Sequence, residues 1–124
     1  MSADVGTRNS ELKERTFDFG VRVVRLVDSL PKGSTAQVIG RQLLRAGTSV
    51  GANYRAAKRA RSRAEFIAKL GIVEEECDET AHWIELLIAL EVVKTKRVSE
   101  LLKEANELVA MVVASIKTAR QNRH

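Results

Sequence analysis

The sequence has too few cysteines, histidines and prolines for several common kinds of fold and site. Its one cysteine, Cys77, excludes an intramolecular disulfide and a cysteine-based zinc site. Two histidines, His82 and His124, are too few for a histidine-rich metal site. One proline and an aromatic content of 4% disfavour a β-sandwich, which needs many turns and aromatic-rich strands. We therefore expect a helical protein with no metal and no cofactor.

Long apolar runs are also missing. No stretch approaches the roughly 20 apolar residues that a membrane-spanning helix needs. The first ten residues contain no apolar segment of the kind found in signal peptides. We expect a cytoplasmic protein with no membrane partner. A hydrophobic content of 44% over 124 residues is enough for the core of one domain.

Short breaks divide the helical pattern of apolar residues into four segments. The first segment is expected to begin near Ser10 and to end at Pro31-Lys-Gly33, because proline and glycine stop helices. The second is expected to begin near Ser34 or Thr35, either of which would cap it, and to end near Ala60.

The third segment begins with Ser62-Arg-Ala-Glu65, a capping box typical of a helix start. A break at Lys94–Arg97 precedes the fourth segment. Connections this short make neighbouring helices antiparallel. The predicted fold is therefore all-α, an antiparallel up-down four-helix bundle over residues 10–120. A flexible N-terminus at residues 1–9 and a flexible tail at residues 121–124 complete the chain.

Apolar residues recur with helical spacing and predict which faces form the core. On the third segment they alternate in steps of four and three, as in coiled-coil packing. Asn53 is expected to be a buried amide that fixes helix register, and Cys77 a buried, inert thiol. The predicted core positions of the last three segments are Ile39, Leu43, Ala46, Val50, Asn53, Ala57, Phe66, Leu70, Val73, Cys77, Thr80, Ile84, Leu87, Val98, Leu101, Ala105, Leu108, Val112, Ile116 and Ala119.

The first segment carries two apolar stripes, whereas a helix of a monomeric bundle needs one. One stripe consists of Phe17, Val21, Val24 and Val27, and the other of Phe19, Val23, Leu26 and Leu30. The extra stripe predicts a second buried surface and therefore self-association. On the second segment, Gly47 and Gly51 lie on one face and predict close approach by another helix.

Charge is strongly segregated along the chain. Residues 29–64 hold eight basic and no acidic residues, whereas residues 65–91 hold eight acidic residues and one lysine. Helical spacing aligns the arginines of the second segment in a stripe opposite its apolar face, which predicts a phosphate-binding surface. The alternative is that the acidic third segment pairs with this stripe, within or between subunits. The predicted nucleic-acid-binding residues are Arg41, Arg45, Arg55, Lys58, Arg59, Arg61 and Arg63.

No constellation in the sequence predicts an enzyme. Glu79 and His82 form one Glu-x-x-His pair, but di-iron bundles need two such pairs with further inward carboxylates. The acidic run Glu74–Glu79 is therefore interpreted as a solvated or salt-bridged face. His82 does not follow an arginine by four to six residues, the spacing found in helical ribonucleases of another bundle class. Tyr54 is the only aromatic residue near the basic stripe, so we do not expect the protein to recognise particular bases of a nucleic acid.

Several motifs resemble the bacterial four helix bundle protein family, also called the 23S rRNA intervening-sequence protein family. Some of its members are encoded within insertions in ribosomal RNA genes. The resemblance covers Arg15 to Arg120 and implies an up-down bundle that assembles as a ring-shaped homopentamer. The motifs that carry it are Arg15-Thr-Phe-Asp-Phe19, Leu30-Pro-Lys32, Arg41-Gln-Leu-Leu-Arg-Ala-Gly-Thr-Ser-Val-Gly-Ala-Asn-Tyr54, Ser62-Arg-Ala-Glu-Phe66 and Glu79-Thr-Ala-His-Trp83.

The family is also similar to the accessory protein of diversity-generating retroelements, a basic pentamer that contacts a reverse transcriptase and nucleic acid. Many relatives carry a glutamate just after the Ala-Asn segment, where this chain has Ala56 and Ala57. The resemblance therefore implies nothing for this chain about the role of that glutamate. The resemblance supplies no catalytic residue.

Two functions remain as expectations. The first is a non-enzymatic homo-oligomer, with five subunits implied by the resemblance, that binds RNA or a nucleic-acid-processing protein through its basic surface. The second is a structural interaction module whose basic stripe is used in contacts between subunits.

Overall fold

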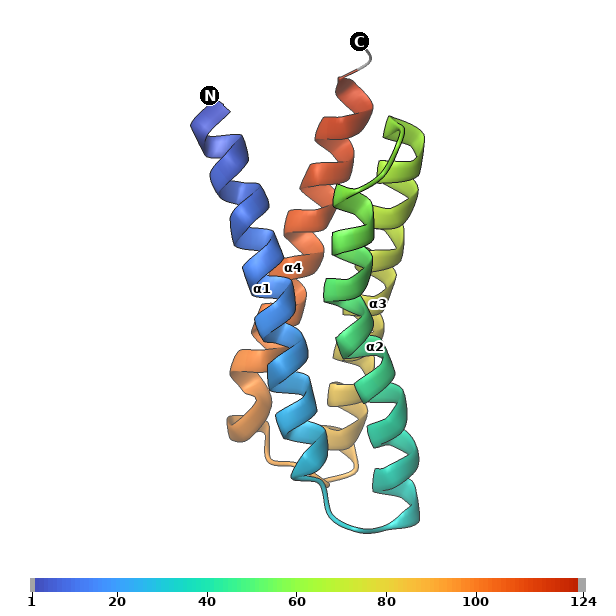
Figure 1. The fold of residues 1–124 in the computed structure, drawn as a ribbon. Helices are drawn as coiled ribbons and strands as arrows, with labels where there is room; N and C mark the ends of the chain where they lie inside the picture. The colour runs from blue at the N-terminus through green and yellow to red at the C-terminus, as the bar shows by residue number, and fades with distance from the viewer. Residues whose placement is uncertain (1, 123–124) are drawn as a thin grey trace.

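The computed structural model describes the backbone of residues 2–122 and the side chains of residues 11–122. In that range the chain forms four long α-helices and no strand. The helices run alternately up and down and are joined by short turns at the two ends of the bundle (Figure 1). The predicted all-α, antiparallel four-helix bundle is confirmed. The helices are α1 (Ser2–Asp28), α2 (Ser34–Lys58), α3 (Arg63–Ala89) and α4 (Thr95–Gln121).

Helix α1 begins earlier than the sequence predicted. It begins at Ser2 and not near Ser10, because nothing in this stretch stops a helix apart from the mild effect of Gly6. The flexibility expected of residues 1–9 and of residues 121–124 stays a prediction. The residues that lie outside the described part of the chain are Met1, Arg123 and His124.

The connection between α3 and α4 also lies earlier than predicted. Glu91 has a φ of 60°, in the left-handed region that favours glycine. The Val92 N–H donates to the Leu87 carbonyl at 2.9 Å, which is the hydrogen bond of a Schellman motif at a helix end. The break therefore spans residues 90–94, whereas the prediction placed it at Lys94–Arg97.

The two capping predictions have opposite outcomes. At α3, the Ser62 hydroxyl accepts a hydrogen bond from the Glu65 N–H at 3.1 Å, as the capping box predicts. At α2, neither Ser34 nor Thr35 is the cap. Gly33 occupies that position with extended backbone and no side-chain hydrogen bond, because Ser34 already has helical geometry.

The core faces predicted for α3 and α4 are confirmed, although Phe66 and Ala119 are only half-buried. From α1, the stripe containing Phe19, Val23 and Leu26 faces the core. The buried residues of the last two helices, of which only Ala81 was not predicted, are Leu70, Val73, Cys77, Thr80, Ala81, Ile84, Leu87, Val98, Leu101, Ala105, Leu108, Val112 and Ile116.

The core face of α2 departs from the prediction at one position. Asn53 is only half-buried, and its side-chain amide donates to the Ser49 carbonyl of its own helix at 2.9 Å. Tyr54, next to it, is 2% exposed and fills the core instead. Both positions fit helical spacing after Val50, and the aromatic ring buries far more apolar surface. The other predicted core residues of α2 are buried: Ile39, Leu43, Ala46, Val50 and Ala57.

Two glycines allow α1 and α2 to approach closely. A Cβ atom on Gly47 would lie 2.6 Å from Cγ1 of Val23, nearer than real Cβ contacts come. A Cβ atom on Gly51 would lie 3.3 Å from the backbone oxygen of Thr16. The tight packing predicted from the Gly47-x-x-x-Gly51 spacing is confirmed, and the helix that packs there is α1.

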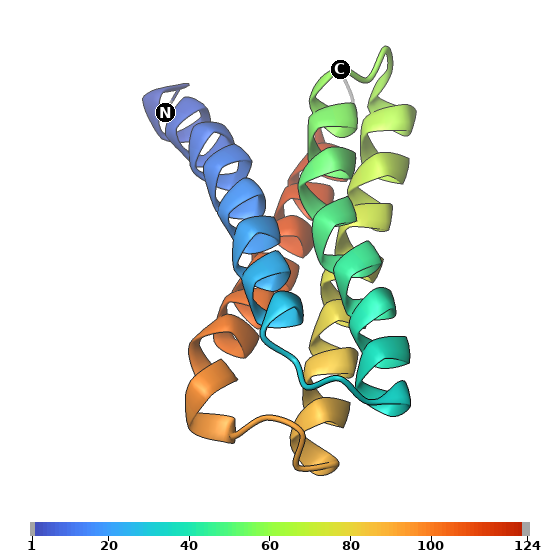
Figure 2. The same ribbon diagram turned by 60° about the horizontal axis from the view of Figure 1, so that its bottom comes forward.

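Helix α1 contacts α4 far less than it contacts α2, and it leans away from α4 toward its N-terminal end (Figures 1 and 2). Arg15 ties the two helices together. Its guanidinium binds Glu104 at 2.6 Å and Glu107 at 2.8 Å, and it also contacts the Met111 sulfur at 3.2 Å. These hydrogen bonds raise the pKa of Arg15 above its usual value, with the Glu104 bond as the largest cause.

Candidate nucleic-acid interface

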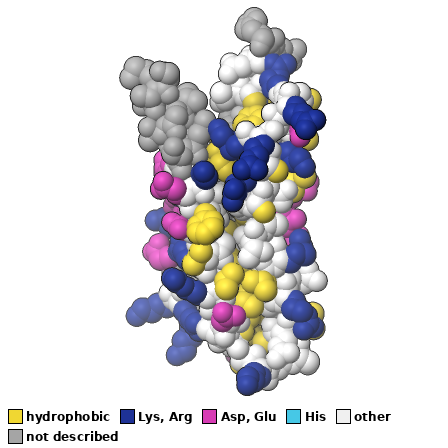
Figure 3. Space-filling model, in the orientation of Figure 1, with side chains coloured by type: hydrophobic (Ala, Val, Ile, Leu, Met, Phe, Trp, Pro, Cys, Tyr) yellow, Lys and Arg dark blue, Asp and Glu magenta, His cyan; other side chains and the backbone are white. Residues whose placement is uncertain are grey.

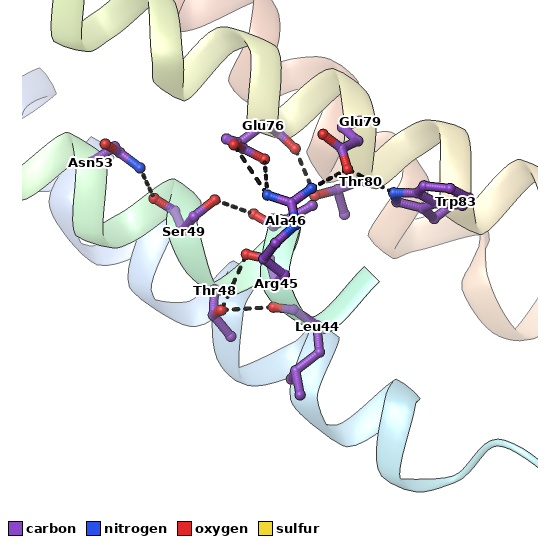
Figure 4. A network of polar contacts seen from close by, with 10 residues as sticks. All are labelled: Leu44, Arg45, Ala46, Thr48, Ser49, Asn53, Glu76, Glu79, Thr80 and Trp83. Carbon is purple, nitrogen blue, oxygen red and sulfur yellow. Dashed lines mark hydrogen bonds and ion pairs between the residues drawn. The ribbon is translucent and has the colours of Figure 1, made fainter. Parts of the chain in front are cut away.

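The predicted basic stripe divides into a paired part and an unpaired part. Arg45 reaches across to α3, where its guanidinium lies 3.2 Å from the Glu76 carboxylate and also binds Glu79 (Figure 4). Glu79 in turn accepts a hydrogen bond from the Trp83 indole N–H at 2.9 Å. The pairing of α2 with the acidic third helix that we considered from the sequence therefore occurs at Arg45, within one chain.

Electrostatics reinforce this network. The hydrogen bond to Glu79 raises the pKa of Arg45, partly opposed by desolvation. The Trp83 hydrogen bond lowers the pKa of Glu79, and the Arg45 contacts lower it further. With its guanidinium held by two carboxylates, Arg45 has less freedom to bind phosphate than the rest of the predicted set.

The other six predicted residues are exposed. Among residues 11–122, ion pairs form only at Arg15 and Arg45, so the side chains of these six form no ion pair with a described carboxylate. Arg63 donates one hydrogen bond to the backbone carbonyl of Asn122. The six residues are Arg41, Arg55, Lys58, Arg59, Arg61 and Arg63.

The fold gathers five of these six at one end of the bundle. Arg55, Lys58 and Arg59 lie at the end of α2, and Arg61 and Arg63 lie in or just after the turn to α3. Arg41 is 14 residues before Arg55 on α2, or about 21 Å along the axis at the usual helical rise. The structure therefore concentrates positive charge at the α2–α3 end and does not spread it evenly along α2.

A surface hollow lies within this charged end. Its walls carry Arg55 from α2, Arg59 and Arg61 from the turn, and Glu65 and Lys69 from α3. Between them, Ala52 and Ala56 contribute only methyl groups. We call this site the basic hollow.

Lys69 was not among the predicted residues, because it stands alone among acidic residues and the run of basic residues ends at Arg63. The short turn between α2 and α3 is the feature from which a contribution of Lys69 could have been predicted. Because the turn between α2 and α3 spans only residues 59–62, the first turns of α3 must lie beside the last turns of α2.

An apolar groove adjoins the basic hollow along the seam between α1 and α2. It is lined by the outward stripe of α1, with Phe17, Val21 and Val24, and by Gly51 of α2. Phe17 is 66% exposed. Arg55 and Ala52 line both the groove and the hollow, so the two form one continuous surface.

Figure 3 shows hydrophobic side chains gathered along this seam, with a cluster of Lys and Arg side chains next to them toward the turn between α2 and α3. Three residues of the second apolar stripe predicted for the first segment, Phe17, Val21 and Val24, therefore line the surface groove of the single chain. The fourth, Val27, packs against the bundle core.

The surroundings of Cys77 and Tyr54 favour packing in the core over a chemical role. Burial raises the pKa of the Cys77 thiol to about 12, which agrees with the predicted inert thiol. Tyr54 is buried, so its ring is not exposed for stacking on bases. In the part of the chain with described side chains, no three His, Cys, Asp or Glu residues are grouped as a metal site would require. None of the helices searched there is both long and apolar enough to cross a membrane.

Comparisons with known proteins agree with the fold. One similar structure is a crystal structure of a protein of unknown function from the S23 ribosomal protein family of Bacteroides thetaiotaomicron. It is 36% identical, with a TM-score of 0.83, and the match covers 89% of this chain and 98% of that chain. No curated protein matches the sequence. The family model described as 23S rRNA-intervening sequence protein matches residues 8–114, and the chain belongs to this family.

Proposed function

We propose that the protein is a non-enzymatic, homo-oligomeric helical bundle that binds RNA or a nucleoprotein through the charged α2–α3 end. The observation that carries this proposal is the basic hollow, which four cationic side chains and only one carboxylate line. None of the four has an ion pair among the described side chains. Affinity for nucleic acid increases with each phosphate that such cations neutralise. The family description, which refers to 23S rRNA, also supports RNA as the ligand.

The proposal predicts a nonspecific, salt-dependent interaction. Contacts to phosphate carry no sequence information, and no aromatic side chain lines the basic hollow for stacking on bases. We therefore expect binding to structured RNA that weakens steeply between 50 and 200 mM salt, as is usual for proteins that contact several phosphates. The proposal implies a cytoplasmic protein.

Arg55→Gln/Arg59→Gln tests the proposal. The double variant removes two cations from the basic hollow and should weaken RNA binding uniformly across sequences. The slope of log K against log salt should fall by about one unit for each lost phosphate contact. Fluorescence anisotropy at four salt concentrations measures both quantities.

The matched control is Lys32→Gln/Lys96→Gln. It removes the same net charge from exposed positions at the opposite end of the bundle, and it should leave affinity and slope almost unchanged. Equal losses in the two double variants would show that net charge alone drives binding. Unchanged affinity in the Arg55/Arg59 variant would contradict the proposed surface.

A second function is favoured by the Arg45 network. That network shows that α2 arginines pair well with α3 carboxylates. Exposed acidic residues remain on α3, among them Glu75, Asp78 and Glu85. In the alternative, a structural interaction module, Arg55 and Arg59 pair with such residues of a neighbouring subunit. The same double variant distinguishes the two, because it would then break the oligomer, as size-exclusion chromatography with light scattering would report.

A further inference from the structure

The charge of the basic hollow exceeds what an internal RNA phosphate requires. Arg55, Arg59, Arg61 and Lys69 against Glu65 leave a net charge of +3 around one small surface depression. A phosphodiester inside a strand carries a single negative charge, whereas a terminal phosphate carries between −1.5 and −2 at neutral pH. The local charge therefore matches the end of a strand better than its interior.

The arrangement of cations along α2 also favours a terminal group. A strand or duplex lying along the helix would need cations at regular intervals to follow its backbone. Arg41 is about 21 Å from Arg55 along the helix axis, and Arg45, between them, is held by Glu76 and Glu79. Free positive charge is thus concentrated at one point, which suits a single dense anion.

The backbone around the hollow is well fixed. The Arg61 N–H donates to the Glu65 carboxylate at 3.3 Å, and the Ser62 cap holds the start of α3. Ala52 and Ala56 keep the space between the arginine stems open. Guanidinium groups suit such a site because their planar donors bind phosphate oxygens in pairs.

We propose that the basic hollow binds a terminal phosphate group, the phosphomonoester at the end of an RNA strand. This inference rests on the proposed function, because it takes RNA as the ligand and adds which part of the RNA is recognised. Small free phosphate compounds carry the same kind of group. The competition experiment distinguishes a phosphate at the end of an RNA from a free phosphate compound.

Competition binding provides the test. A fluorescent RNA is displaced from the protein by three unlabelled 12-nucleotide RNAs of one sequence, carrying a 5′-phosphate, a 3′-phosphate or hydroxyls at both ends. We expect one of the phosphorylated RNAs to compete about tenfold better than the hydroxyl-ended RNA. Equal competition by all three overturns this inference but leaves the proposed function intact, whereas no binding of any RNA overturns both.

Inorganic pyrophosphate is the probe for the second source. If pyrophosphate and the phosphorylated RNA displace the fluorescent RNA equally at equal concentration, the hollow is a site for free phosphate compounds. That result would overturn the assignment to an RNA end. We expect pyrophosphate to be at least tenfold weaker than the phosphorylated RNA, because it makes no contacts outside the hollow.

Three variants localise the effect. In Arg59→Gln/Arg61→Gln, the phosphorylated RNA should compete no more than twofold better than the hydroxyl-ended RNA. Lys58→Gln, at the same end of the bundle but outside the lining of the hollow, should weaken all three RNAs and leave their ratio unchanged. Glu65→Gln should raise the preference about threefold, because glutamine can keep the capping box while the negative charge is lost. A preference unaltered in both the Arg59/Arg61 and the Glu65 variants, with helicity retained, would show that the hollow is not the site.

Discussion

Glu91 lies just past the end of α3, in a backbone conformation that is uncommon for a residue with a side chain. It occupies the position that follows the cap of α3, with a φ of 60°. The left-handed conformation costs a residue with a side chain roughly 1–2 kcal/mol, whereas glycine adopts it freely. The chain accepts this cost because the Schellman hydrogen bond and the half-buried Val92 fix the turn. No local pattern predicted this turn, since glutamate is an ordinary helix-forming residue.

Replacing Glu91 by glycine should stabilise the protein. The conformational cost is removed, and the greater freedom of glycine in the unfolded chain offsets only part of that gain. We expect the free energy of unfolding to rise by about 0.5–1 kcal/mol. Chemical denaturation monitored by circular dichroism measures the change.

Glu91→Ala serves as the control, because alanine removes the carboxylate and keeps the conformational cost. It should give no such increase. Equal stabilisation by alanine and glycine would attribute the effect to charge, and the backbone argument would be wrong.

At the scale of helices, periodic patterns in the sequence were enough to predict the fold. They could not predict which residues far apart in the sequence contact each other. Steps of four and three from Leu70 to Leu87 gave the core face of α3, because a helix that buries one face must place apolar residues at that spacing. Arg15 and Glu104 are 89 residues apart, and no local pattern joins them. The same limit applies to Lys69, which enters the basic hollow only once α2 and α3 lie side by side.

Gly47→Ala tests the close packing of α1 on α2. The added Cβ would lie 2.6 Å from a methyl group of Val23, so one of the two helices must shift. Although alanine is the better helix former, we expect a loss of about 1–3 kcal/mol in unfolding free energy. Val23→Ala in the same chain should recover part of that loss, which a double-mutant cycle would measure.

Gly71→Ala is the matched control within α3. A Cβ at Gly71 would have no atom within 4 Å, so only the helix propensity changes. This variant should gain about 0.5–1 kcal/mol. Similar effects at Gly47 and Gly71 would exclude the packing argument.

At the scale of the whole molecule, the apolar groove is the feature that the single chain leaves unburied. Phe17 is mostly exposed, and Val21 and Val24 are half-buried beside it. Exposed apolar surface of this kind commonly marks a contact between proteins. We propose that a second copy of the chain covers it, and the five subunits implied by the family resemblance stay an expectation.

Phe17→Glu/Val21→Glu should convert the oligomer to a monomer of 13.7 kDa with unchanged helicity. The charges would point to solvent in the single chain but would be buried between subunits, where unpaired charges are costly. Light scattering at micromolar concentration measures the mass. Val38→Glu, at a position that is 53% exposed and outside the groove, should leave the assembly intact. A wild-type chain that is already monomeric under these conditions would contradict self-association altogether.

The sparse contact between α1 and α4 also affects how quickly the chain folds. Most contacts between helices join neighbours in sequence, α1 with α2, α2 with α3 and α3 with α4, so few of them require distant parts of the chain to meet. Proteins dominated by such local contacts fold within microseconds to milliseconds. Association of subunits is slower and depends on concentration. Each subunit would therefore be fully folded before it meets another, and the apolar groove would be exposed to water for the whole of that interval.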